Sequence, residues 1–557
     1  MVGTGGNGVP SVPTVPGTGH THRVETGPAI RLTVDGDEVE VPDDGGTLLE
    51  ALRGPLGHRS AKDGCSPQGQ CGCCTVLVDG QPRVSCVTPV RRVAGRTVTT
   101  LNGLLEDEVA RWTDAFRAAG GSQCGFCTPG IVVRFAGLLA TSPDDPPDRD
   151  RAARALHAHL CRCTGWQTVL DAWDLGVGNG TPVDLSAASS GPDASARRAT
   201  IEGRSPQVVS ADVVRGRGGF ATDTVPDGCL VAVPRDGAVN GGWADPDGWV
   251  VADTLAEARR LSGKVQGRRT TAEVAPPLEA PSGDWDAVLR TCWVEPAPLE
   301  TDAAWCGPGD EPAGPLANGG AFGAKSDSPL SAVARALADR HGRPVLVAPS
   351  REDTVRHGAK RPPVAGGARA DGTGVLHVVR TPGIVEAVAA VAPDLEVVEV
   401  DVAGPPTSAT VRAAGWAEAV VLLAGAGATE QGSPVRSPDG ADATAVVEGS
   451  GAGTTIRVTV RCGEVLDEVV LRSYCVGAAH MAWSWVTSEG LSVDADGTVH
   501  DLTIRSFGIV RATETPAIAI EVVLDDGEAV NGSDAVFAAV AAATWRHLGC
   551  PPDLPGG

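Results

Sequence analysis

The chain has 557 residues, of which 42% are hydrophobic and 21% are charged. That composition can bury a core, which excludes a wholly disordered protein. Its 46 basic and 69 acidic residues give a net charge of −23, and aromatic residues make up only 4%. An acidic chain with so few stacking side chains disfavours nucleic acid and anionic membrane surfaces as partners.

The N-terminal residues carry no targeting signal that we can recognise. Residues 1–28 are rich in Gly, Thr, Val and Pro, and they lack the basic start and apolar stretch of a secretory signal. No run in the chain approaches the ~20 apolar residues that span a bilayer. We therefore expect a disordered tail over residues 1–28, no membrane segment and a cytoplasmic location.

Cysteine is the most informative residue type, because nine of the 15 cysteines fall between Cys65 and Cys163. An odd total in a chain without an export signal argues against a disulfide framework. A dense cluster of thiols in a reducing compartment indicates a metal centre instead.

The first cysteine group lies in a predicted β-rich domain, residues 29–101. Residues 30–41 alternate apolar and polar side chains around Asp35-Gly36, as in a β-hairpin, and residues 75–80 repeat the strand-and-turn pattern. Between them runs CSPQGQCGCC, a Gly-rich loop whose backbone N–H groups can approach the sulfides of an iron–sulfur cluster. We predict a [2Fe–2S] cluster with these ligands: Cys65, Cys71, Cys74 and Cys86.

Spacing alone leaves this ligand set open at two points. Plant-type [2Fe–2S] proteins separate the first two cysteines by four residues, whereas here the gap is five. Cys73 is an extra thiol in the loop, which we expect to face away from the cluster. A zinc site is the alternative interpretation, although zinc ligands come more often as paired short spacings.

The second group is predicted to lie among helices, in residues 102–175. Residues 104–118, 130–140 and 151–160 show apolar side chains at helical spacing. Thr128-Pro129 is typical of a helix start, which places the first two cysteines near a positive helix end. The other two, two residues apart, must mark a break between helices. A four-helix bundle would then join these ligands of a second [2Fe–2S] cluster: Cys124, Cys127, Cys161 and Cys163.

Residues 29–175 resemble the two-cluster iron–sulfur unit of the xanthine dehydrogenase/aldehyde oxidase family of molybdenum hydroxylases. The resemblance rests on GCSPQGQCGCCTVLVDG, SQCGFCTPG and LCRCTGW, which follow one another in the family's order. It implies a ferredoxin-like β-grasp domain followed by a helical bundle. It also implies that Gln123 and Cys124 lie beside a molybdopterin, although Gln123 could equally cap a helix.

The rest of the chain resembles the family's molybdenum-binding subunit in a shortened, divergent form. We expect a linker over 176–212, with a contact-free spacer as the alternative, then an α/β hammerhead-like domain over 213–280. A molybdopterin-binding-like α+β region follows over 281–557. In it, residues 318–325 (NGGAFGAK) resemble the family's Gly-rich cofactor loop. The implied cofactor-binding residues, for which a plain turn is the alternative, are Gly319, Gly320, Phe322 and Gly323.

Two departures from the family bear on catalysis. Residues 213–557 are about half as long as the family's molybdenum subunit, and no counterpart of its Arg-bearing loop is recognisable. The family's catalytic glutamate also has no counterpart, because Ser533 occupies its place when the glycines are aligned. A serine without an activating partner is no base near neutral pH. Asp534 is a weak candidate for the base, and a turn or helix N-cap is the better interpretation.

The resemblance implies an oxidoreductase: a molybdopterin centre hydroxylating an N-heterocycle or aldehyde, with electrons passing through two [2Fe–2S] clusters to an external acceptor. No FAD-binding stretch is present, so a FAD-binding subunit or another acceptor would be a separate chain. The alternative is an electron-transfer and scaffold subunit whose molybdenum region is degenerate and which needs a separate catalytic subunit.

Overall fold

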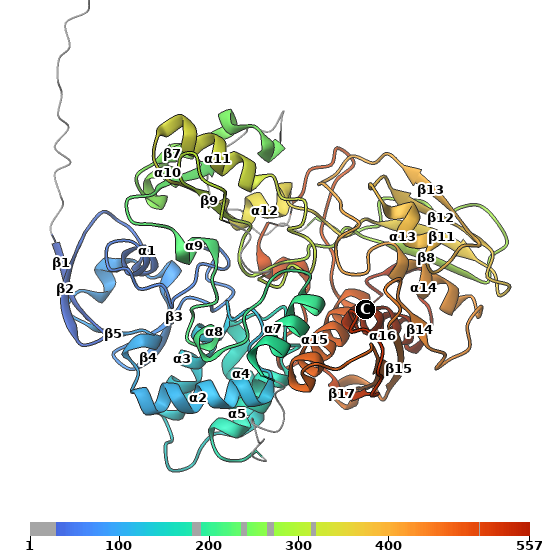
Figure 1. Cartoon of the computed structure of the whole chain (residues 1–557), viewed down its shortest axis with the longest axis horizontal. Coiled ribbons are helices and arrows are strands. Elements are labelled where there is room, and N and C mark those ends of the chain that lie inside the picture. The colour runs from blue at the N-terminus through green and yellow to red at the C-terminus, as the bar shows by residue number, and fades with distance from the viewer. Residues whose placement is uncertain are drawn as a thin grey trace, which may run out of the picture.

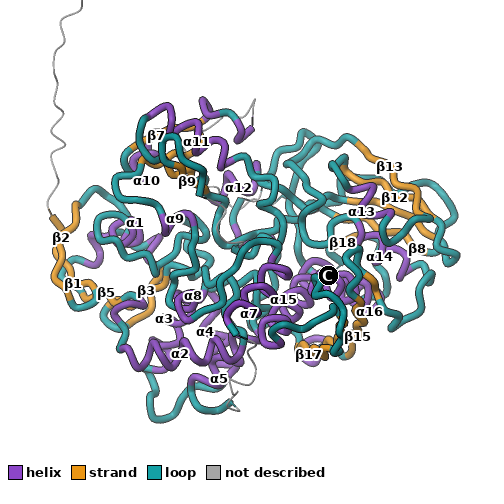
Figure 2. The backbone as a smooth tube through the Cα atoms, in the orientation of Figure 1, coloured by secondary structure: helices purple, strands orange, loops and turns teal. Residues whose placement is uncertain are grey.

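The computed structural model describes residues 29–180, 191–235, 242–263, 272–313, 319–500 and 502–556. It is an α+β protein, with four β-sheets within these ranges (Figure 1). Strands lie at both ends of the molecule and in further groups at its upper edge and lower right, and helices lie between and beside these groups (Figure 2). The predicted tail, residues 1–28, lies outside the described residues. Of the helices described, none is long and apolar enough to cross a membrane.

The N-terminal sheet has the strand order β2-β1-β5-β3-β4, and the predicted hairpin joins its first two strands. Asp35 and Gly36 turn with φ of 52° and 97°, the left-handed conformations that a two-residue hairpin turn requires. Helix α1 (Leu48–Arg53) follows a capping box formed by Thr47 and Glu50. The strands are β1 (Ala29–Val34), β2 (Asp37–Pro42), β3 (Thr75–Val78), β4 (Gln81–Val84) and β5 (Thr97–Thr99).

Four helices follow, as predicted for residues 102–175. Their core is aromatic: the rings of Trp112 and Trp173 stack at 5.7 Å, and Phe135 meets Trp173 edge-on at 4.9 Å. Because these rings are buried, they fix the helices against one another. The helices are α2 (Glu106–Ala119), α3 (Thr128–Leu139), α4 (Arg149–Ala155) and α5 (Gln167–Gly176).

The described part of the expected linker is helical and packed. Helix α7 (Pro192–Gly203) carries an Arg198–Glu202 ion pair at 3.1 Å in which neither side chain is exposed. Arg198 also donates to the backbone carbonyls of Val465 and Val530. Residues 191–203 are therefore part of the core, not a contact-free spacer. Two short helices follow, α8 (Ala211–Val214) and α9 (Ala221–Thr224).

The next sheet has the order β7-β6-β10-β9 and is built from distant segments. Its first two strands fall in the expected hammerhead-like region, 213–280, whereas the other two lie beyond residue 280. The unit therefore extends to about residue 350. Its elements are β6 (Leu230–Pro234), β7 (Trp249–Ala252), α10 (Leu255–Ser262), β9 (Ala304–Cys306), α11 (Leu330–His341) and β10 (Val345–Val347).

Two further sheets and the longest described helix form the C-terminal lobe. One sheet has the order β13-β12-β11-β8-β18, with β8 (Ala287–Thr291), β11 (Val364–Ala368), β12 (Gly374–Val379), β13 (Leu395–Val400) and β18 (Asp553–Leu554). The other has the order β14-β15-β16-β17, with β14 (Val435–Arg436), β15 (Asp442–Glu448), β16 (Thr455–Arg461) and β17 (Ala517–Val522). The helices are α12 (Arg351–His357), α13 (Ile384–Ala389), α14 (Trp416–Gly425), α15 (Glu468–Thr487) and α16 (Ser533–His547).

Helix α15 joins the lobe to the cysteine-bearing helical domain. It packs against α16, α7 and β17, and it also contacts α2 and α5. Gly477 lies so close to the Cys163 carbonyl that a Cβ there would overlap it. The C-terminal lobe is thus seated directly on the second cysteine group.

Candidate iron–sulfur centres and their surroundings

The first cysteine group closes into a buried cage of four thiols. Cys65, Cys71 and Cys74 are each 1% exposed, and Cys86, in the 3₁₀ turn after β4, is 2% exposed. The Cys65 sulfur accepts hydrogen bonds from the N–H groups of residues 68 and 70, at 3.2 and 3.4 Å. The loop thus turns its amides toward the sulfur side, as an anionic cluster requires.

Thiol–thiol contacts favour charge on one member of this cage. The pKa of Cys65 is lowered well below its usual value, because the thiols of Cys71 and Cys86 donate to its sulfur, with the two loop amides adding to them. Cys73 is buried as well, and its thiol lies 3.8 Å from the Cys71 carbonyl oxygen. Burial raises the pKa of the Cys73 thiol, and nearby thiols of both groups add electrostatically to this effect. The ligand choice among these five thiols stays a prediction.

The second cysteine group also comes together, and its thiols meet in pairs. Cys127 stands at the N-cap of α3, with Pro129 in the first turn as predicted. The sulfurs of Cys124 and Cys163 are 3.6 Å apart, and the thiol of Cys127 hydrogen-bonds that of Cys161. Two thiolates bound at ~2.3 Å to one tetrahedral metal lie about 3.7 Å apart, so each pair suits one iron of a two-iron cluster. In the described ranges, no three His, Cys, Asp or Glu side chains converge on a single-ion site.

One thiol of this group favours its charged form. The pKa of Cys161 is lowered to about 6, chiefly because the Cys127 thiol donates to its sulfur, although burial opposes this. The Thr164 hydroxyl lies 3.0 Å from the same sulfur and adds to the effect. Each cage therefore contains one cysteine whose thiolate form is stabilised, and the thiolate is the form that binds iron.

The two cages are joined by a direct backbone contact. Leu160, which precedes Cys161, donates its N–H to the Cys71 carbonyl at 3.0 Å. The His159 ring covers Gly72, whose φ of 72° and lack of a side chain permit that approach. A single hydrogen bond therefore links the backbone of Cys71, in the first cage, to Leu160, the neighbour of Cys161 in the second cage.

Two glutamines of the longer first loop are functional-site residues that the sequence alone did not identify. The Gln68 amide donates to Glu352 at 2.8 Å and to the Leu502 carbonyl at 2.9 Å, and its oxygen accepts from the N–H of Ile504. The Gln70 oxygen accepts from the N–H of Arg505 at 3.0 Å. The loop that holds the first cage is therefore anchored to the C-terminal lobe, and no local sequence signal indicates that contact.

The predicted Gly-rich loop lies beside the second cage. A Cβ on Gly320, whose φ is 91°, would lie 2.9 Å from the Cβ of Arg162 and 3.5 Å from the Cys163 sulfur. On the other side, the Gln123 amide donates to the Cys163 carbonyl at 2.9 Å and to the Ser473 hydroxyl at 3.0 Å. The buried side-chain oxygen of Gln123 has no hydrogen-bond partner in the described structure. Asn318, the first residue of the predicted loop, lies outside the described residues.

Arg162, between two cage cysteines, forms a buried bidentate ion pair with Glu489. Both oxygens of Glu489 lie 2.5 Å from the guanidinium, and the side chains are 3% and 1% exposed. Arg162 also donates to the Pro296 carbonyl at 2.9 Å. This pair fixes the second cage to the C-terminal lobe, because a buried charge is retained only with a partner.

The candidate base Asp534 is already engaged by cations. Arg412 contacts one carboxylate oxygen at 3.1 Å, and Arg204 forms an ion pair with the other. Arg412 also donates to the Ser533 hydroxyl at 3.0 Å, and its guanidinium lies over the Phe322 ring at 3.8 Å. The structure thus links Phe322 to residues 533 and 534 through one arginine. That Asp534 acts as a base stays a prediction. In this structure both of its carboxylate oxygens are held by arginine side chains.

The start of α16 is held by a carboxylate from the connecting helix. Glu202 of α7 accepts from the N–H groups of Gly532 at 3.1 Å and Ser533 at 2.9 Å. A carboxylate at this end of a helix satisfies unpaired N–H groups and complements the helix dipole. Residues 533 and 534 therefore open a capped, buried helix.

Comparisons with known proteins agree with the two cages. A family described as "2Fe-2S iron-sulfur cluster binding domain" matches residues 32–95, and one described as "[2Fe-2S] binding domain" matches residues 100–174. The chain is 35% identical over 143 residues to the xanthine dehydrogenase iron-sulfur-binding subunit of Escherichia coli O157:H7, covering 89% of that subunit and 26% of this chain. It is 41% identical over 144 residues to the aldehyde oxidoreductase of Megalodesulfovibrio gigas, covering 25% of this chain and only 16% of that enzyme.

The fold extends beyond the iron–sulfur part. A crystal structure of the aldehyde oxidoreductase of Desulfovibrio desulfuricans matches with a TM-score of 0.67 and 15% identity, covering 93% of this chain and 97% of that chain. The two cages and both family matches define a protein with two [2Fe–2S] clusters. Because it covers nearly all of the iron-sulfur-binding subunit at 35% identity, the chain belongs to the xanthine dehydrogenase/aldehyde oxidase family of molybdenum hydroxylases.

Neither of two hollows beside the second cage in the described structure is large enough for a pterin as the side chains are arranged, and the one that borders Gln123 has about 170 Å³. Between the Gly-rich loop, α15 and α16 the open volume is about 20 Å³, which is room for a water molecule. Small-molecule cofactors occupy about 300 Å³ or more. The space is filled by Phe322, by Arg412 and by the Arg361 guanidinium, which lies 4.3 Å from the Trp485 ring centre.

Proposed function

We propose that the chain is the two-cluster electron-transfer component of a molybdenum hydroxylase. It would carry electrons released when an N-heterocycle or an aldehyde is hydroxylated at a molybdopterin centre, and deliver them to an external acceptor such as a FAD-binding subunit. The observation that carries the proposal is the pair of buried four-thiol cages joined through the Leu160–Cys71 hydrogen bond. When bound, each [2Fe–2S] cluster supplies a one-electron carrier.

The chain's own residues keep the two cages close, dry and oriented. Burial of the thiols excludes water and lowers the local dielectric constant, which makes a cluster's potential depend on its nearest hydrogen bonds and charges. Loop amides donate to Cys65, and Thr164 lies beside Cys161. The protein thus supplies orientation and electrostatics, and the metal centres supply the redox chemistry.

The surroundings of the cages suggest an entry side and an exit side. Gln123 and Gly320 flank Cys163 on the side toward the C-terminal lobe, where the family resemblance places the molybdopterin. On the first cage, Val87 follows Cys86 directly and is 50% exposed. We infer that this edge is the exit side, because it brings a cluster ligand to within one residue of the solvent-exposed surface.

A second candidate function is favoured by the filled space at the second cage. In this candidate the molybdopterin is held by a separate catalytic subunit, and residues 281–557 act as a scaffold. The open volume of about 20 Å³ and the engaged carboxylate of Asp534 support it. No catalytic step is assigned to the chain's own residues in either case.

Metal content and spectroscopy test both candidates. The protein would be purified without air from a host that makes the molybdenum cofactor. We expect about four irons per chain and two distinguishable [2Fe–2S] signals in electron paramagnetic resonance after reduction. Two irons or fewer, or a single signal, would refute the two-cluster proposal. With full iron, about one molybdenum per chain supports a cofactor within this chain, and no molybdenum supports the separate subunit.

A further inference from the structure

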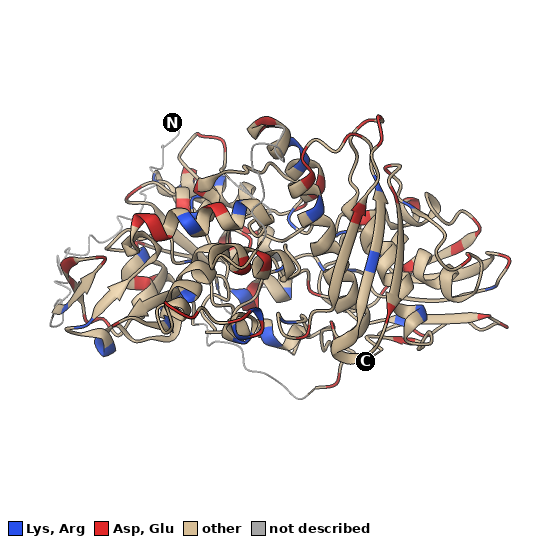
Figure 3. Ribbon diagram, turned by 90° about the horizontal axis from the view of Figure 1, so that it is seen from below, with Lys and Arg blue, Asp and Glu red and all other residues tan. Residues whose placement is uncertain are grey.

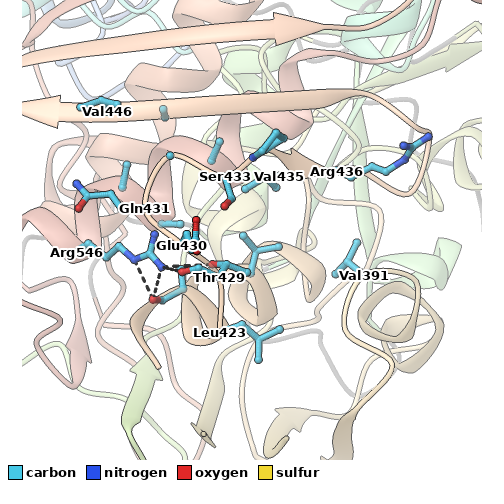
Figure 4. Close-up of a pocket in the computed structure, with 18 of the residues that line it drawn as sticks. Val391, Leu423, Thr429, Glu430, Gln431, Ser433, Val435, Arg436, Val446 and Arg546 are labelled. Atoms are coloured by element: carbon cyan, nitrogen blue, oxygen red, sulfur yellow. Dashed lines mark hydrogen bonds between the residues drawn. The ribbon is translucent and has the colours of Figure 1, made fainter. Parts of the chain in front are cut away.

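A second hollow lies in the C-terminal lobe, away from both cages. It is bordered by α14, α16, strand β15 and the loop of residues 429–434, and its volume is about 600 Å³ (Figure 4). Pockets for small molecules have about 300–1,000 Å³. None of its lining residues also lines the narrow hollow beside the second cage, although both hollows take residues from α16. The hollow is therefore separate from the surroundings of the second cage.

One wall of the hollow is apolar and made of short side chains. It is formed by Val391, Val420, Leu423, Ala539, Ala542 and Ala543. Ala539 and Ala542 are buried, and the others from the two helices are half-buried, because the hollow opens to solvent. Such a wall gains free energy when a flat apolar group covers it.

The charged groups at its edge favour an anion. Arg546 donates to the carbonyl of Ala424 at 2.6 Å and to that of Thr429, and Figure 4 shows it across the hollow from Arg436. In the described ranges, no carboxylate lies within ion-pair distance of either guanidinium. The lining holds two arginines and one acid, Glu430, which gives it an excess of one positive charge.

That excess stands out in a chain of net charge −23. Figure 3 shows acidic and basic residues interspersed along the ribbon. A guanidinium bound only by uncharged oxygens, as that of Arg546 is, keeps its full charge and can still bind a carboxylate or phosphate. From the apolar wall and these two arginines, we infer that the hollow binds a small molecule with a flat apolar body and one anionic group. This site goes beyond the proposed electron-transfer function and does not depend on it.

The test compares two probes of one shape on the full-length, iron-loaded protein. Naphthalene-2-carboxylate carries the charge, and naphthalene-2-carboxamide does not. We expect isothermal titration calorimetry to give about tenfold tighter binding of the carboxylate, since hydrogen bonds to charged groups are the stronger ones. Ligand-induced shifts in the NMR spectrum would report the same ratio.

Two variants and a control locate the site. Arg436→Gln removes one exposed guanidinium and should weaken the carboxylate three- to tenfold while leaving the carboxamide unchanged. Ala543→Glu puts a carboxylate one helical turn from Arg546, in the hollow, and should abolish carboxylate binding. The control is Ala332→Glu, the same change on an exposed position of α11, which should leave binding as it is.

Three outcomes would overturn the inference. They are absence of binding of both probes at millimolar concentration, equal affinity for the two, and carboxylate binding that survives Ala543→Glu. The iron content and the cluster spectra should stay constant throughout. Failure of this site is therefore distinguishable from failure of the electron-transfer proposal, which is decided by those same spectra.

Discussion

The Arg162–Glu489 pair leads to a quantitative prediction for the second cage. Glu489→Gln keeps the side-chain shape but removes the negative charge that both guanidinium bonds reach at 2.5 Å. The side chains are 3% and 1% exposed, so water cannot replace it. Breaking a buried pair from one side costs 3–5 kcal/mol. In the variant, the side-chain amide oxygen at position 489 and the Pro296 carbonyl can each still accept a hydrogen bond from Arg162. We therefore expect the free energy of unfolding to fall by about 3 kcal/mol, the lower end of that range.

Urea unfolding followed by visible circular dichroism of the iron–sulfur chromophores measures this loss. The matched control is Glu448→Gln, which breaks an exposed pair with Arg457 whose side chains are 63% and 54% exposed, and which should cost less than about 1 kcal/mol. The variant should also raise the reduction potential of one cluster only, because a negative charge near it has been removed. Arg162→Met combined with Glu489→Leu should recover most of the stability. The reasoning is refuted if Glu489→Gln is as mild as the control.

Three further predictions concern the cages and the buried helix beside them. Cys73→Ala should keep about four irons per chain by metal analysis, whereas Cys71→Ala should keep about two; equal losses would show that Cys73 is a ligand. Gly320→Ala should cost 1–3 kcal/mol and alter the spectrum of the second cluster alone, because its Cβ would come within 2.9 Å of Arg162 at a φ of 91°. Burial, with Arg162, lowers the pKa of His480 to about 3. The unfolded chain therefore binds the extra proton first, and His480 should lower the stability by about 1.6 kcal/mol from pH 6.5 to 5. Burial lowers the pKa of His159 in the same way, so His480→Met should remove about half of the combined fall, and an unchanged slope would contradict the assignment.

The local features of the N-terminal part could be predicted from the sequence because each depends on neighbouring residues. The Asp35-Gly36 turn, the helix start at Thr128-Pro129 and the cysteine spacings are all visible within a few positions. The structure places them as expected, and it gathers the two cysteine groups. The choice between Cys73 and its neighbours remained open, because spacing does not encode which way a thiol points.

The unpredicted features are contacts between residues that are far apart in the sequence. Gln68 meets Leu502 and Ile504 across more than 430 positions, and Arg162 meets Glu489 across 327. No periodicity or local motif signals such a pairing. The same holds for the sheet that joins β6 to β10, and for α7, whose Gly- and Ser-rich surroundings are typical of a linker. In each case tertiary packing, not local preference, decides the structure.

The position of Glu202 constrains how such a chain could be divided into two genes. Several relatives are separate small iron–sulfur subunits, which cover residues near the N-terminal quarter of this chain. A break anywhere before α7 would leave Arg198 and Glu202 with the C-terminal product, where the N–H groups of Gly532 and Ser533 need them. A break after α7 would strip that helix start of its carboxylate. A break between α5 and α7 would keep this carboxylate on the same product as the helix start that it caps.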